Sequence, residues 1–92
     1  MIESFKCKET EALFAQKRVL RFMSFERVGR RKLNMLHAAI LLTDLSMPPG
    51  NKLEALERDR KGQHSIRIND QWRICFVWTG TNACDVEIID CH

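Results

Sequence analysis

Three short segments in the second half of the chain alternate between apolar and other residues, and turn residues separate them. The segments cover residues 64–68, 72–78 and 84–89, and they are joined by Asn-Asp-Gln at 69–71 and Thr-Gly-Thr-Asn at 79–82. Alternation with a period of two is typical of strands with one buried face. Strands joined by such short turns run antiparallel, because a parallel connection needs about a dozen residues or more. This half of the chain is therefore predicted to form an antiparallel meander.

The first half of the chain has helical periodicity instead. Apolar or small residues recur at steps of three and four, at Phe22, Phe25, Gly29, Leu33, Leu36 and Ile40. This spacing predicts one amphipathic helix over about 24–42, with Ser24 as its N-cap. Arg27, Arg30, Arg31 and Asn34 fall on the opposite side of that helix. They form either a solvated face or a basic face that meets phosphate.

Shorter elements complete the predicted order. Ile2 and Phe5 flank a short opening strand, residues 9–14 read as a short helix, and Met-Pro-Pro-Gly-Asn at 47–51 ends the helical half. Helices followed by a sheet predict the α+β class, with helices on one face of the sheet. Ninety-two residues with 45% apolar content fit one domain over 1–92.

Charge and cysteine content limit which partners and which cellular compartment are expected. Residues 1–50 contain nine Lys/Arg against five Asp/Glu, whereas residues 51–92 contain six against seven. The basic excess weakly favours an anionic partner. No run approaches the roughly 20 apolar residues of a membrane span, and the first residues do not resemble a secretion signal. We therefore expect a cytoplasmic protein whose cysteines are free thiols.

The chemistry-bearing residues are expected to gather on the sheet face that the helices leave uncovered. Arg67 and Arg73 lie on strands joined by a tight turn, so they are predicted to be cross-strand neighbours that need an anion such as Asp90 or a phosphate between them. Asp90 and His92 are two residues apart, which on an extended chain places them on one side as an acid/base pair. Further cationic or polar candidates for contacts with RNA are Gln71, Lys52, Arg58, Arg60 and Lys61.

This set of residues suits metal-independent cleavage of RNA. Attack by the 2′-hydroxyl requires a base, charge stabilisation for the phosphorane and an acid for the leaving oxygen, and arginine supplies the charge stabilisation. No group of His, Cys and acidic residues has metal-ligand spacing, and we expect no cofactor. Surface salt bridges are the alternative interpretation of Arg67 and Arg73. His64 is interpreted as structural, and His37 has no visible partner in the sequence.

Four stretches of the sequence carry a resemblance to a known family. They are Met-Ile-x-Ser-Phe at the start, Pro-Pro-Gly-Asn-Lys-Leu-Glu-Ala-Leu at 48–56, the run from Gly62 to Phe76, and the final Val-Glu-Ile-Ile-Asp-x-His. Along its whole length the chain resembles HigB-type toxins of bacterial type II toxin–antitoxin modules, in the RelE superfamily and its GraT-like branch. The resemblance implies a RelE-like fold and a ribosome-dependent endoribonuclease that cuts mRNA in the decoding site.

The resemblance also implies partners and residue roles. The expected partner is a HigA-type helix-turn-helix antitoxin, and operator DNA would be bound only through that antitoxin. Asp90, His92 and Arg73 match the catalytic positions of the family, while Arg67 and Gln71 lie where substrate contacts are expected.

Two departures from the family pattern leave other functions open. Many relatives carry tyrosine at the position of Cys91 and lysine at the position of Glu57. At Glu57, either Lys52, Arg58 or Arg60 takes over the role of that lysine or the nuclease is weakened. Both departures also favour a non-catalytic module that binds ribosome or antitoxin and acts as a corepressor. A direct DNA binder using Arg27, Arg30 and Arg31 is a third alternative.

Overall fold

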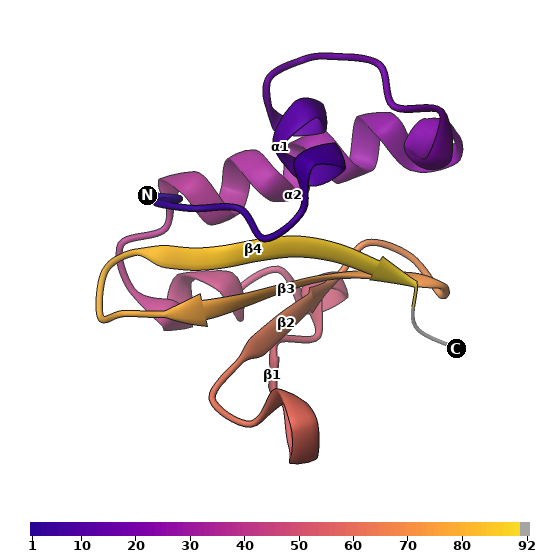
Figure 1. Cartoon of the computed structure of the whole chain (residues 1–92). Coiled ribbons are helices and arrows are strands. Elements are labelled where there is room, and N and C mark those ends of the chain that lie inside the picture. Colours follow the sequence, from indigo (N-terminus) through magenta and orange to yellow (C-terminus); the bar gives the residue numbers. More distant parts are fainter. Residues whose placement is uncertain (91–92) are drawn as a thin grey trace.

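A helical layer packs against one face of a four-stranded antiparallel sheet in the computed structural model, which describes residues 1–90 (Figure 1). The helices are α1 (Lys8–Phe14), the 3₁₀ helix η1 (Leu20–Phe25) and α2 (Glu26–Ala38), followed by the 3₁₀ turns η2 (Leu42–Leu45), η3 (Pro49–Asn51) and η4 (Arg58–Arg60). The strands are β1 (Glu54–Ala55), β2 (His64–Arg67), β3 (Trp72–Trp78) and β4 (Ala83–Asp90). The predicted α+β class and the antiparallel meander are confirmed, since the sheet order is β1-β2-β3-β4.

The core forms between the apolar face of the sheet and the predicted stripe of α2. Ile66, Ile74 and Ile88 are register partners across three strands, so their side chains form one row on that face. Trp72 lies beside them, with its ring centroid 5.7 Å from that of Phe22 and 5.1 Å from that of Phe25. Burying aromatic rings of this size supplies a large share of the apolar contact that stabilises so small a domain.

The predicted helix over 24–42 is shorter than expected at both ends. Ser24 belongs to η1, so its prediction as the N-cap is wrong, and Phe25 occupies that position without a side-chain hydrogen bond. The helix ends at Ala38 because Ala39 adopts an extended conformation, and Ile40 is 69% exposed beyond it. Asp44 accepts hydrogen bonds from the backbone N–H groups of Leu41 and Ile40, which hold the pKa of its carboxyl below the usual range.

The first residues of the chain cover the free edge of β4. Instead of the predicted short strand, Ile2 and Phe5 form isolated parallel bridges to Ala83 and Val86. Backbone hydrogen bonds of 2.8–3.1 Å accompany these bridges. The N–H of Ile2 also donates to Nδ1 of His37 at 3.1 Å, so His37 does have a partner and fastens the N-terminal segment to α2.

Within residues 1–90, none of the helices combines the length and apolar character needed to cross a bilayer.

Candidate active site

The sheet face opposite the helices carries two adjacent rows of register partners. Arg67, Arg73 and Ile89 form one row, and Ser65, Cys75 and Glu87 form the other. Because register partners on antiparallel strands project to the same side, the two arginines are cross-strand neighbours, as the sequence predicted. The tight turn at 69–71 produces this register: Oδ1 of Asn69 accepts hydrogen bonds from the backbone N–H groups of Gln71 and Trp72, both at 2.9 Å.

Each arginine of the pair has a carboxylate of its own. Nη2 of Arg73 lies 3.3 Å from Oε1 of Glu54, and Arg67 pairs with Asp70 three residues away. These two carboxylates relieve the repulsion between the arginines. The sequence had predicted that Asp90 or a phosphate would do so. Asp90 is the register partner of Trp72 and accepts a hydrogen bond of 3.1 Å from Nε2 of Gln71.

Arg73 links three elements and retains one uncommitted nitrogen. Its Nε donates to Oγ of Ser65 and its Nη2 donates to the carbonyl of Lys52, both at 2.9 Å. These contacts hold the segment between η3 and β1 against the sheet. Nη1 of Arg73 has no acceptor among residues 1–90, so the guanidinium is oriented by its other donors and can still bind an anion.

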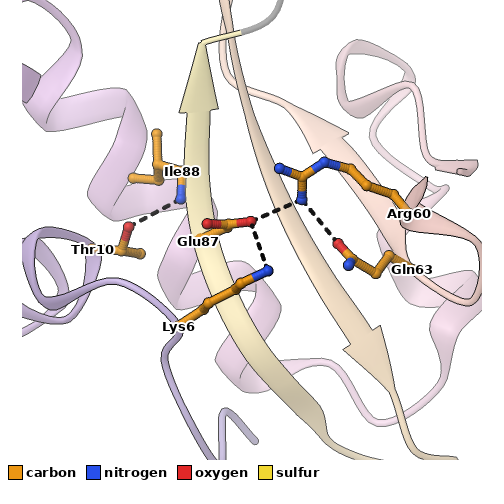
Figure 2. A network of polar contacts seen from close by, with 6 residues as sticks. All are labelled: Lys6, Thr10, Arg60, Gln63, Glu87 and Ile88. Carbon is orange, nitrogen blue, oxygen red and sulfur yellow. Dashed lines mark hydrogen bonds and ion pairs between the residues drawn. The ribbon is translucent and has the colours of Figure 1, made fainter.

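The segments on either side of β1 contribute cations in two different states. Lys52, Arg58 and Lys61 are exposed, and none of their side chains has a partner within the described part of the chain. Arg60, in contrast, is engaged: its Nη1 donates to Oε1 of Gln63 at 3.2 Å and to Oε1 of Glu87 at 2.8 Å (Figure 2).

Glu87 is the centre of a polar network that joins three parts of the chain. Besides Arg60, the Nζ of Lys6 lies 3.9 Å from the same oxygen of Glu87 (Figure 2). The Glu87 side chain is only 16% exposed, so its charge requires these cations. On the other side of β4, the N–H of Ile88 donates to Oγ1 of the buried Thr10 at 3.0 Å. The network ties η4, the N-terminal segment and α1 to β4.

The predicted catalytic pair falls only in part within the structure. Asp90 is the last described residue, and its register partner Trp72 precedes Arg73 directly. Asp90 therefore lies at the same end of the sheet as the arginine row. As the partner of the core residue Trp72 it projects to the helix side, so the expectation that it shares a face with Arg67 and Arg73 is wrong. His92 and Cys91 lie outside the described residues. His64 is half-buried, and its ring stacks on Phe76 with centroids 6.2 Å apart, in keeping with its structural interpretation.

The sequence reading missed a buried lysine near this site. Lys32 is 7% exposed and donates a hydrogen bond to the fully buried Asn51. Burial lowers the pKa of its ammonium group, and the charges of Arg31 and Arg67 lower it further. The signal was available, because position 32 is three residues after Gly29 and therefore borders the apolar stripe.

Two open hollows lie elsewhere, on the outer side of α2. One has a volume of about 500 Å³ and is lined by Gln16, Glu26, Arg27, Arg30, Arg31 and Asn34. The other, of about 490 Å³, is lined by Arg27, Val28 and Arg31. Neither includes a residue of the sheet, so they are separate from the Arg67–Arg73 row.

Comparison with known proteins gives matches in both sequence and structure. A family model described as the RelE-like toxin HigB of a type II toxin–antitoxin system matches residues 3–92. Toxin HigB-1 of Vibrio cholerae is 41% identical over 80 residues, which are 85% of this chain and 84% of the relative. An uncharacterized protein of Haemophilus influenzae is 42% identical over 52 residues, 56% of this chain and 52% of its own length.

Two solved structures share the fold at low sequence identity. The crystal structure of a histidine-to-glutamine mutant of YafQ from E. coli superposes with a TM-score of 0.64 at 11% identity and covers 98% of this chain and 93% of its own. YafQ from E. coli strain BL21(DE3) gives a TM-score of 0.56 at 10% identity, with the same coverage. At this identity the likeness supports the architecture of helices on an antiparallel sheet.

Proposed function

Since the chain belongs to the HigB family of RelE-like toxins of type II toxin–antitoxin systems, we propose that it is a ribosome-dependent endoribonuclease that cuts mRNA in the decoding site. Membership of such a system implies an antitoxin partner. We propose that this partner is a HigA-type helix-turn-helix protein, that operator DNA is bound only through it, and that the toxin acts in the cytoplasm.

One observation carries the catalytic proposal: Arg67 and Arg73 are register partners on the sheet face opposite α1 and α2, and Nη1 of Arg73 is uncommitted there. Two arginines on neighbouring strands can both contact the scissile phosphate. Their positive charge stabilises the phosphorane, whose negative charge exceeds that of the starting phosphodiester. Asp90 lies at the same end of the sheet.

The proposed reaction is an internal transfer at phosphorus. The 2′-oxygen forms a bond to phosphorus and the bond from phosphorus to the 5′-oxygen breaks, leaving a 2′,3′-cyclic phosphate and a 5′-hydroxyl. A base removes the proton of the 2′-hydroxyl and an acid protonates the leaving 5′-oxygen. His92 and Asp90 are proposed for these proton transfers, and Arg73 for the charge. In this proposal no step requires a metal ion.

The remaining candidates are proposed to hold the RNA on either side of the cut. Lys52, Arg58 and Lys61 are exposed and have no described partner, so they can contact phosphate at little cost. Arg60 would have to exchange Glu87 for phosphate. Gln71 and Arg67 lie beside the reacting end of the sheet.

Toeprinting on purified translating ribosomes tests this proposal. The wild-type toxin is expected to produce cuts within decoded codons, whereas Arg73→Ala and His92→Gln abolish them. Arg18→Ala serves as the matched control, because Arg18 is exposed and has no partner in the described residues. Cutting that is unchanged in both site variants would refute this active site.

A non-catalytic binding module is the second candidate. Two carboxylates favour it, because negative charge opposes phosphate binding. Glu57 is exposed directly before the cations of residues 58–61, and Glu87 already engages Arg60. In the same assay a binder would stall ribosomes without producing cuts.

A further inference from the structure

The outer side of α2 carries two exposed guanidinium groups that have no partner within residues 1–90. They belong to Arg27 and Arg31, which are four residues apart and line both hollows described above. Four residues correspond to about one helical turn, so the two charges lie one above the other and repel. A like-charge pair without a counter-ion costs stability, which is typical of a surface that meets an anion supplied by something else.

The other charged residues of the larger hollow are already committed. Arg30 donates to the carbonyls of Leu13 at 3.1 Å and Lys17 at 2.8 Å, and its Nη1 donates to Glu26 at 3.0 Å. Arg30 therefore fastens the end of α1 to α2, and Glu26 is neutralised by it. The uncompensated charge of the hollow comes from Arg27 and Arg31.

The composition of the hollows favours a phosphate backbone over a protein partner. Protein interfaces rely on buried apolar anchors, whereas nucleic-acid backbones are bound by arginine, lysine and amide donors. The only apolar residue lining either hollow is the half-buried Val28. The large exposed hydrophobic side chains of the described chain lie elsewhere, at Met1, Leu20, Met23, Ile40, Leu41 and Met47.

We propose that Arg27 and Arg31, with Asn34 and Gln16 beside them, bind the sugar–phosphate backbone of structured RNA at a site separate from the sheet. The inference rests on the proposed function, in which that RNA is ribosomal. Gly29, Leu33 and Leu36 are the buried side of α2, and Gly29 lies against Leu13 of α1. The exposed Arg27 and Arg31 are on the other side of that helix, and neither hollow that they line includes a residue of the sheet. Figure 1 shows α2 in the helical layer on one face of the sheet. The toxin thereby holds ribosomal RNA on its helical layer and mRNA on its sheet.

The test compares two variants that lose the same charge. Arg27→Gln/Arg31→Gln removes the proposed contacts, and Lys8→Gln/Arg18→Gln removes two exposed cations that do not line the hollows. Affinity is measured by fluorescence anisotropy for a labelled RNA duplex and by co-sedimentation with ribosomes, over a range of salt concentrations. Binding to the co-expressed antitoxin and the kinetics of mRNA cleavage are measured on the same proteins.

We expect the Arg27/Arg31 variant to bind both RNA targets about tenfold more weakly, with the slope of log K against log salt reduced by about 1.5. Cleavage should need more ribosomes for half-maximal rate, with kcat unchanged. The thermal midpoint should not fall, because a repulsive pair has been removed. The control variant should change these quantities much less.

Other outcomes separate this inference from the proposed function. Unchanged RNA and ribosome affinity in a variant that still cuts mRNA overturns the inference alone. Lost affinity for antitoxin with unchanged RNA binding also overturns it and assigns the face to the antitoxin. If the wild type binds the duplex through Arg27 and Arg31 but cuts no mRNA, the RNA site is supported and the nuclease proposal is refuted. A wild type that binds neither duplex nor ribosome overturns both.

Discussion

Two ion pairs of equal length but different burial allow one electrostatic argument to be tested within this chain. Arg60–Glu87 and Arg21–Glu9 each have a nitrogen–oxygen distance of 2.8 Å. The side chains of the first pair are 36% and 16% exposed, whereas both side chains of the second are 46% exposed. Since distance is constant, any difference in coupling energy reports the surroundings of the charges.

The expected magnitudes follow from solvent screening. Exposed pairs contribute about 0.2–1 kcal/mol in double-mutant cycles, and we place Arg21–Glu9 in the lower half of that range. Breaking a fully buried pair costs about 3–5 kcal/mol. Glu87 is shielded from solvent but Arg60 is more than a third exposed. We therefore expect a coupling energy of only about 1–1.5 kcal/mol for that pair. Lys6, 3.9 Å from Glu87, partly compensates for a lost arginine and also keeps the value low.

The assay is a double-mutant cycle for each pair. Each cycle compares the wild type with two single alanine variants and the double variant, and urea unfolding measures the stability of every protein. Other contacts of Arg60, including the one to Gln63, cancel in the cycle. For a domain of this size 1 kcal/mol corresponds to about 4–8 °C in Tm, so Glu87→Ala alone should be visible in a thermal scan. Equal coupling in the two cycles would refute the assignment of a stronger interaction to the shielded pair.

Three further predictions concern single side chains. Arg73→Lys should reduce mRNA cleavage by about 10²-fold or more while the fold is retained, because lysine keeps the charge but not the fork that orients it; near-normal cleavage would contradict this. Lys32→Met should remove a rise in stability with pH: burial holds the pKa of Lys32 below its usual 10.5, so between the two values the unfolded chain binds more protons and the wild type gains stability as pH increases. Urea unfolding from pH 7 to 10 measures that slope, and parallel slopes for variant and wild type would show that Lys32 is not its source. Thr10→Val should lower the free energy of unfolding by about 1–3 kcal/mol, because the N–H of Ile88 loses its acceptor, whereas Thr10→Ser should retain most of the stability; equal losses in the two variants would exclude the hydroxyl as the cause.

The features predicted correctly from sequence depend on neighbours along the chain. The period of two and the turn at 69–71 determine that Arg67 faces Arg73, because register across a tight turn follows from counting residues. The stripe of α2 likewise follows from spacing alone, and Leu33 and Leu36 are buried as expected.

The features that were missed depend on contacts between distant residues. Glu54 was not recognised as a partner of Arg73, because the position of β1 against β2 is not encoded in local pattern. The same holds for Glu87 and Arg60, which are 27 residues apart. Ser24 looked like a helix cap by residue type, but packing of Phe22 and Phe25 on Trp72 favours a 3₁₀ turn there.

The N-terminal segment that lies along β4 has a consequence for handling the protein. Unpaired backbone groups on an edge strand are a template on which other chains can add, and aggregation is the common result. Here residues before α1 satisfy those groups at Ala83 and Val86. Trimming these residues, or displacing them with an affinity tag, would let β4 pair with the same strand of another copy. Precipitation of such a preparation would then result from the exposed edge strand and not from loss of the hydrophobic core.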